Sequence, residues 1–177
     1  MINKVVLFNR EIIPCHLNEM YLNEFRSKLS RSVVEDGYFY LQWMFPVLGK
    51  SKWHTNTLPL CEQDISELRS DPIAKNNILK SADLILSFFN IAPKNGLYIY
   101  NTLNNQENDY WLRGIGHEEK KISRIALSLY YIGLTELSHS LIDVSISVLT
   151  DRGFKTKRET LSTVSFWQDI FITRQIY

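Results

Sequence analysis

Hydrophobic residues recur every three or four positions over most of the 177-residue chain, and this period predicts amphipathic helices. Helices are expected over residues 14–29, 33–45, 62–69, 72–90, 118–131, 135–153 and 160–177. Asp71 before Pro72 is typical of a helix N-cap followed by a first-turn proline, and Gly133 suits a helix end. The predicted fold class is therefore all-α, with about six or seven helices in one compact domain.

The segment before residue 14 lacks a helical period and predicts a short strand or an extended arm. The expected organisation is an N-terminal arm over residues 1–13, a helical domain over residues 14–153, and a C-terminal helix over residues 154–177 packed on the same domain. Residues 47–60 have no period and predict a loop, and residues 97–108 predict an irregular excursion with a short strand.

Composition agrees with a soluble globular domain, since 45% of the residues are hydrophobic and 22% are charged. The 20 Lys and Arg residues nearly balance the 19 Asp and Glu residues, so no overall field favours nucleic acid or an anionic membrane. No apolar run approaches the roughly 20 residues that span a bilayer. We therefore expect a cytoplasmic protein that binds neither nucleic acid nor membrane.

The cysteines and histidines predict neither a metal site nor a cofactor. Cys15 and Cys61 lie far apart and in no metal-binding or redox spacing, which favours two free thiols in a reducing compartment. The four histidines never pair at a metal-binding helix spacing. Lys120 and Lys121 form a basic cluster with Arg124, and such a cluster is typical of a solvated helix face.

Residues 37–46, GYFYLQWMFP, combine five aromatic rings with one uncharged amide. The residues of this stretch that share one helical face predict core packing, namely Tyr38, Leu41 and Phe45. Gln42 lies beside that stripe and Trp43 lies off to the side, so core packing alone requires neither of them. A buried glutamine destabilises a fold unless it is hydrogen-bonded, so Gln42 either ties the loop over residues 46–60 in place or faces a ligand.

Arg124 stands between Ile122 and Ile125 on a predicted helix, which places its guanidinium at the edge of the core. It either holds the fold together or binds a ligand, and the sequence leaves both roles open. The other candidates are polar or aromatic residues near the predicted loops, namely His54, Asn56, Trp111, Arg113 and His117. Together with Gln42 and Trp43, these residues are expected to form the binding site.

Several motifs resemble the opioid growth factor receptor conserved domain. YFYLQWMFP at residues 38–46 resembles its Y-I-Q-W-L-F-P signature, and NTLPL at residues 56–60 resembles its N-x-x-P-L segment. KISRIALSL at residues 121–129, with a GL pair after it, is similar to the R-I-T-R-I-L-x-S-L helix of the family. The motifs follow one another in the family's order, and the similarity covers about residues 30–150.

The resemblance implies an all-α domain that occurs in animal peptide receptors and in short microbial proteins. The chain has only His117, Glu118 and Glu119 where the family carries an asparagine- and histidine-rich stretch, and it lacks the repeat-bearing C-terminal extension of the animal receptors. The resemblance is therefore to a short microbial member. Nuclear import, growth regulation and enkephalin binding are not carried over to it.

Three functions are compatible with these residues. The one we expect is a noncatalytic module that recognises a peptide or protein partner through an aromatic, partly polar groove. The second is an enzyme for a small anionic or nucleotide-like substrate, with His54 or His117 as the acid-base group and Arg113 or Arg124 holding the anion. The third is a small partner protein, such as an antitoxin or an immunity factor, which would bind through a flat patch.

Overall fold

The computed structural model describes residues 2–37, 39–48, 60–102, 106–112, 117–152 and 157–173, without the side chains of residues 36, 39, 106, 117, 157–159 and 161. Its helices are α1 (Lys4–Asn9), α2 (Leu22–Ser27), α3 (Arg31–Asp36), α4 (Phe39–Met44), α5 (Glu62–Ser70), α6 (Pro72–Ser87), the 3-10 helix η1 (Gln106–Leu112), α7 (His117–Tyr131), α8 (Thr135–Arg152) and α9 (Lys157–Thr173). The strands β1 (Ile91–Lys94) and β2 (Leu97–Tyr100) form an antiparallel hairpin. The fold is mostly helical, which confirms the predicted fold class.

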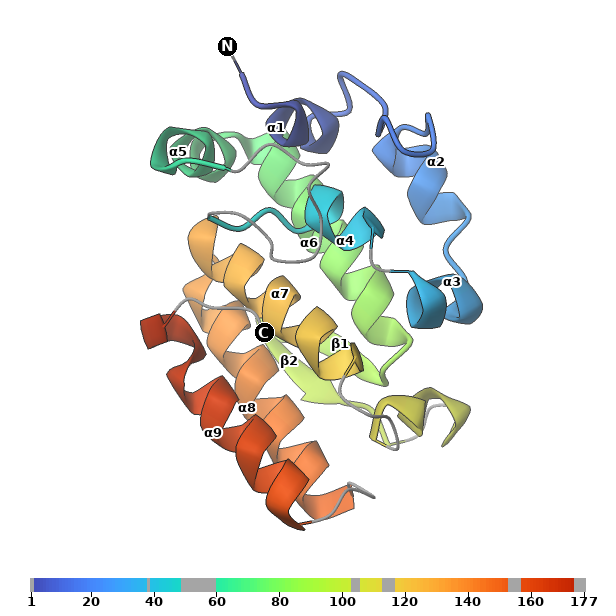
Figure 1. The fold of residues 1–177 in the computed structure, drawn as a ribbon, viewed down its shortest axis with the longest axis vertical. Coiled ribbons are helices and arrows are strands. Elements are labelled where there is room, and N and C mark those ends of the chain that lie inside the picture. The colour runs from blue at the N-terminus through green and yellow to red at the C-terminus, as the bar shows by residue number, and fades with distance from the viewer. Residues whose placement is uncertain are drawn as a thin grey trace.

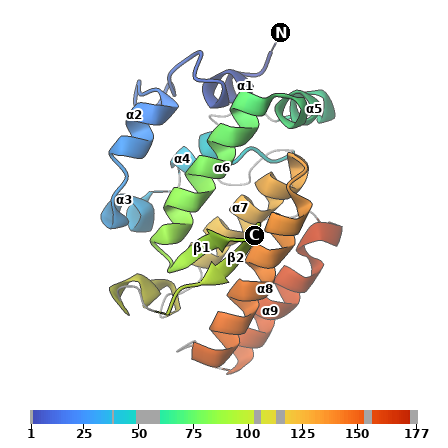
Figure 2. The ribbon, with the colours of Figure 1, turned by 180° about the vertical axis from the view of Figure 1, so that it is seen from behind.

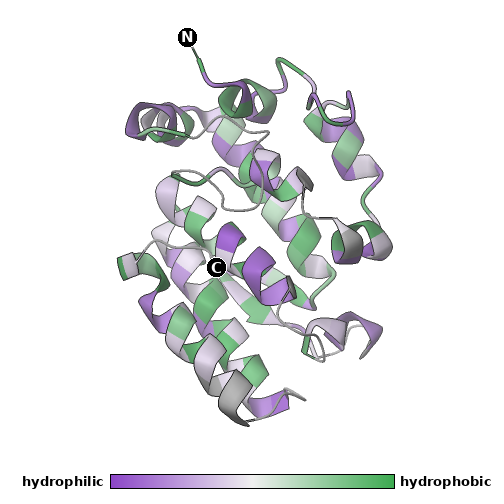
Figure 3. Cartoon of the chain, viewed as in Figure 1, coloured by the Kyte–Doolittle hydropathy of each residue, from purple (hydrophilic) through white to green (hydrophobic). Residues whose placement is uncertain are grey.

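The helices lie in two groups that the hairpin connects (Figure 1). In one group α7, α8 and α9 pack side by side, and in the other α1, α5 and α6 contact one another. From behind, the hairpin lies between α6 and α8, with β1 packed on α6 and β2 on α8 (Figure 2). Hydrophilic and hydrophobic positions alternate along the helices (Figure 3), as expected for helices around a shared core. Of the helices that the structure describes, none is long and apolar enough to cross a membrane.

The N-terminal segment is helical, and the prediction of a strand or an arm there is wrong. The Asn3 side chain caps α1, because it accepts a hydrogen bond from the Val5 amide over 3.0 Å. Val5, Val6 and Phe8 are buried in the core. A helix of six residues spans fewer than two turns, so its hydrophobic period is too short to recognise in the sequence.

The helix expected over residues 14–29 is shorter in the structure, because only α2 is helical there. Before α2 the chain closes a turn in which the Cys15 amide donates to the Met20 carbonyl over 2.9 Å. Glu19 has a φ of 57°, a left-handed conformation that a right-handed helix cannot contain. The hydrophobic spacing of this segment therefore comes from separate contacts with the core and not from one helical face.

Gly37 divides the helix expected over residues 33–45 into α3 and α4. A Cβ atom at Gly37 would lie 2.5 Å from Cε1 of Tyr40 and 2.8 Å from the Val33 carbonyl oxygen, so a larger residue does not fit. Two short helices have two carboxyl ends, and the last carbonyls of each need partners outside the helix. The break at Gly37 thus creates a requirement for donors from elsewhere in the chain.

A turn at Asn95 and Gly96 connects the two strands. Their positive φ values of 53° and 79° suit a two-residue hairpin turn. The short strand expected in the excursion is confirmed as β2, and the Tyr98 amide joins it to α8 by donating to the Ser140 hydroxyl over 2.9 Å. The predicted helices from residue 62 onward are confirmed as α5, α6, α7, α8 and α9, with small differences at their ends. Residues 174–177 of the last predicted helix lie outside the described residues.

Asp71 caps α6 and also joins it to the end of α1. Its carboxylate accepts hydrogen bonds from the amides of Ile73 (2.8 Å) and Ala74 (3.0 Å) and from the Arg10 guanidinium. Burial alone would raise the pKa of Asp71, but the Ala74 amide and Arg10 outweigh burial and hold the pKa below its usual value. Asp71 therefore stabilises the fold in its ionised form.

Asp71→Asn should keep a helix cap but lose the ion pair, and it should lower the free energy of unfolding by about 1 kcal/mol near neutral pH. Because the folded-state pKa is depressed, the stabilisation by Asp71 is complete above the unfolded-state pKa and is lost as the pH falls through the folded-state pKa. Urea unfolding at about pH 6 and about pH 3 measures this dependence. A difference between parent and variant that stays equally large at the lower pH would contradict this role of the carboxylate.

Candidate functional site at the junction of α4 and α7

The structure describes the side chains of only some of the residues expected in the site. Those described are Gln42 and Trp43 on α4, Trp111 in η1 and Arg124 on α7. Those outside the description are His54, Asn56, Arg113 and the side chain of His117, whose backbone begins α7. Within the described ranges, no group of three or more His, Cys, Asp or Glu side chains is arranged to hold a metal ion.

Trp43 and Trp111 are core residues in this structure. Trp43 is 2% exposed and packs edge-on against Phe8, with ring centroids 5.5 Å apart. Trp111 is fully buried, and its Nε1 donates to the Phe89 carbonyl over 3.1 Å. The interpretation that core packing does not require Trp43 is therefore wrong. Its packing partner comes from α1, a helix that the sequence pattern did not predict.

Gln42 is buried as well, at 4% exposure. Burial agrees with both roles that the sequence left open, because a buried amide needs partners either in the protein or in a ligand. Beyond α4, Leu48 and Leu60 form an isolated parallel bridge, which brings the two ends of the intervening segment together. The bridge therefore places Leu60, just before α5, beside the chain that leaves α4.

Arg124 binds the carboxyl end of α4. Its Nε donates to the carbonyl oxygens of Leu41 (3.2 Å) and Phe45 (2.9 Å). The Leu41 carbonyl also accepts the Phe45 amide over 2.8 Å. The carboxyl end of a helix carries the negative end of its dipole, so a guanidinium stabilises the carbonyls there. Burial lowers the pKa of Arg124 to about 10, which still leaves the group protonated at neutral pH. The contact explains why an arginine stands at the edge of the core.

Lys121 binds the carboxyl end of α3 in a similar way. It is fully buried, and its Nζ donates to the carbonyls of Val34 and Glu35, the second over 2.9 Å. The Glu118 carboxylate lies 3.9 Å from Nζ. The interpretation of this basic cluster as a solvated face is therefore wrong for Lys121. The signal in the sequence was its spacing, because residues three positions apart share a helix face and Arg124 was already expected near the core.

Arg69 makes the same kind of contact at another place. This residue of α5 donates from Nε to the Tyr131 carbonyl at the end of α7, over 3.0 Å. The side chain of Arg69 is otherwise exposed. Three basic residues thus bind the carboxyl ends of α3, α4 and α7, and Arg69 provides a matched control for Arg124.

In the described part of the chain, the contacts of Arg124 involve one nitrogen of its guanidinium. The group carries N–H donors on three nitrogens, and in the described part of the chain only Nε has acceptors. Burial is the cause that lowers the pKa of Arg124, and no carboxylate contributes to it. Among the described residues, none accepts a hydrogen bond from the two terminal nitrogens.

Comparison with known proteins agrees with the motifs of the sequence. A family model described as the opioid growth factor receptor (OGFr) conserved region matches residues 3–168. The matched residues include α4 and the helix that carries Lys121 and Arg124. A search of curated proteins found no match, and a search of solved structures found none either.

Proposed function

Because the chain belongs to the family of the opioid growth factor receptor (OGFr) conserved region, we propose that it is a noncatalytic binding module for a peptide or protein partner. The proposal rests on the guanidinium of Arg124 at the end of α4, because only its Nε donates to acceptors in the described chain. Nε binds the α4 carbonyls and fixes the orientation of the group, while its terminal nitrogens point to no acceptor in the described chain. A carboxylate of the partner, from an acidic side chain or a chain terminus, has the complementary charge and shape.

The fixed orientation of Arg124 favours binding, since a side chain that is already ordered loses little conformational entropy when a ligand arrives. A single charge-assisted contact contributes only about 1.5 to 3 kcal/mol, so a ligand with useful affinity must also make contacts beyond Arg124. A peptide or protein surface can make such contacts over a wide area without a deep pocket. This favours a polypeptide partner over a small anion.

The experiment is a selection of peptides that bind the purified chain, followed by affinity measurements on the best peptide. Arg124→Lys is expected to weaken binding about tenfold or more, because lysine keeps the charge but lacks the planar pair of donors. Arg69→Lys changes the same kind of helix contact at the end of α7 and should alter the affinity by less than about twofold. Thermal unfolding of both variants establishes that they are folded.

Equal affinity of the parent and a folded Arg124→Lys variant would rule out this role of Arg124. A second outcome separates the alternatives. If no peptide is selected, and phosphate or a nucleotide binds in a way that depends on Arg124, the enzyme for a small anionic or nucleotide-like substrate becomes the better proposal.

A further inference from the structure

Residues 11–20 form a strap that connects α1 to α2 at one end of the domain (Figure 1). Glu11 and Glu19, near the two ends of the strap, have positive φ values of 59° and 57°. Residues other than glycine are destabilised in this left-handed region, and they persist there only when surrounding contacts hold them. The backbone of the strap is therefore strained at both ends.

The hydrogen bonds of residues 13–20 are internal to the strap in the part of the chain that the structure describes. The Cys15 amide donates to the Met20 carbonyl over 2.9 Å, and the Glu19 amide donates to the Cys15 carbonyl over 2.8 Å. The Asn18 side chain accepts from the Met20 amide over 3.2 Å. Since these bonds join residues 13–20 only to one another, that part of the strap can leave the domain without breaking them. The amides of Glu11 and Ile12 donate to the carbonyls of Phe8 and Leu7 and keep that end of the strap on α1.

The strap covers Trp43. Cys15 is 3% exposed, and the ring of His16 lies against the indole with centroids 5.1 Å apart. In contrast, Ile12 and Leu17 are 57% and 40% exposed, so closure of the strap leaves two of its large apolar side chains in water. Trp43 Nε1 is buried and has no hydrogen-bond partner among the described residues, which destabilises the closed arrangement.

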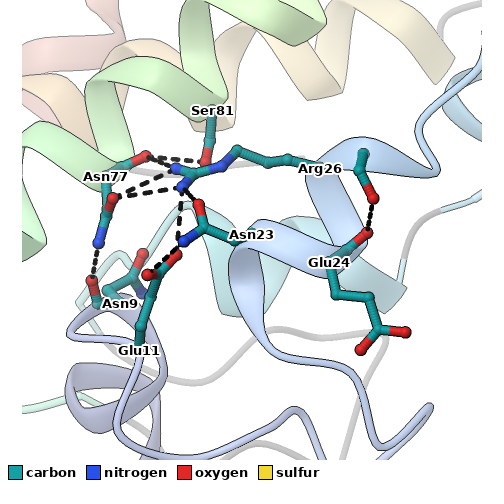
Figure 4. A network of polar contacts seen from close by, with 8 residues as sticks. Asn9, Glu11, Asn23, Glu24, Arg26, Asn77 and Ser81 are labelled. Carbon is teal, nitrogen blue, oxygen red and sulfur yellow. Dashed lines mark hydrogen bonds and ion pairs between the residues drawn. The ribbon is translucent and has the colours of Figure 1, made fainter.

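A polar network holds the strap at Glu11 (Figure 4). The Arg26 guanidinium on α2 donates to the Glu11 carboxylate over 3.2 Å and to the Asn77 carbonyl on α6 over 3.1 Å. The Asn23 side chain also donates to Glu11. Asn77 donates in turn to the Asn9 carbonyl at the end of α1, over 2.9 Å. The network therefore anchors one end of the strap to three helices.

We propose that the strap opens as a unit next to Glu11 while the helices stay folded, and that opening exposes Cys15 and one side of the Trp43 indole. The strained ends, the self-contained turn and the unbonded indole N–H favour the open state. The Glu11 network and the burial of Cys15 favour the closed state. In the open state water or a ligand can accept a hydrogen bond from Trp43 Nε1. This gate is a property of the chain itself and does not depend on the proposed function.

The labelling rate of the Cys15 thiol measures how often the strap opens. The experiment uses a Cys61→Ser variant, because this substitution removes the exposed thiol and places a favourable N-cap residue before α5. Burial raises the pKa of the Cys15 thiol, so the closed strap keeps it protonated and unreactive. The labelling rate is measured with a thiol reagent at low urea concentrations. Opening of a short segment exposes little surface, so the rate should change by less than about twofold in urea too dilute to unfold the domain.

Glu11→Gln, added to the Cys61→Ser variant, should raise the labelling rate about threefold, because it weakens the contact with Arg26. Glu62→Gln, at an exposed glutamate of α5, is the matched control and should leave the rate unchanged. The proposal would be overturned if the labelling rate rose with urea concentration as steeply as global unfolding does. It would also be overturned if Cys15 were not labelled until the whole domain unfolds. Equal rates for the two glutamate variants would overturn the anchoring role of Glu11.

Discussion

Lys121→Ala is expected to lower the free energy of unfolding by about 3 kcal/mol. The substitution removes a fully buried side chain and leaves a cavity in its place. It also removes the donor to the Val34 and Glu35 carbonyls, so the carboxyl end of α3 loses a partner that water cannot easily replace. Urea unfolding followed by circular dichroism measures the loss.

Two more substitutions separate this contact from a general effect of charge. Lys120→Ala removes the neighbouring, partly exposed lysine and should change the free energy of unfolding by less than about 0.5 kcal/mol. Lys121→Met keeps most of the buried stem but removes the donor, so its effect should lie between the other two. If Lys121→Ala were as mild as Lys120→Ala, Lys121 would not be the residue that holds α3.

Trp111→Ala is expected to lower the free energy of unfolding by about 4 kcal/mol, since it removes the largest type of side chain from a fully buried position. Trp111→Phe keeps an aromatic ring but leaves the Phe89 carbonyl without its donor, and it should cost about 1 to 2 kcal/mol. The same unfolding experiment measures both variants. The comparison separates the hydrogen bond from the packing of the ring.

These substitutions also test the position of Trp111 relative to a binding surface. The sequence suggested this residue as an aromatic wall of a groove, whereas the structure places it in the core against Phe89, with ring centroids 6.3 Å apart. A folded Trp111→Phe variant should therefore bind the selected peptide as the parent does. A variant with parental stability that no longer binds the peptide would show that Trp111 acts in recognition.

The long helices could be predicted from the sequence because each repeats its hydrophobic period over several turns. α6 and α8 also have end signals in the chain, such as Asp71 with Pro72. The short N-terminal helices could not be predicted in the same way. α1 is specified by a cap at Asn3 and by burial of Phe8 against Trp43, and the second of these contacts joins residues far apart in the sequence.

The site was predictable in part. The position of Arg124 between two inward-facing isoleucines placed its guanidinium at the edge of the core, and the structure agrees. Its acceptors could not be foreseen, because the contact joins α7 to the end of α4, whose residues lie far from Arg124 in the sequence. Lys121 was missed because its acceptors lie where Gly37 ends α3 and α4 then begins as a separate short helix. A buried lysine is explained by carbonyls that the sequence pattern had assigned to the interior of one continuous helix.

We propose that Nε of Arg124 binds the carbonyls of the fold and that its two terminal nitrogens bind a ligand. Nitrogen-15 NMR of the arginine side chains tests it directly, with Arg124→Lys to assign the signals. In the free chain the Nε–H of Arg124 should exchange slowly with water while the terminal N–H groups exchange rapidly, and the selected peptide should slow only the terminal groups. Rapid exchange of Nε–H in the folded free chain, or terminal groups that are unchanged by a bound peptide, would contradict the claim.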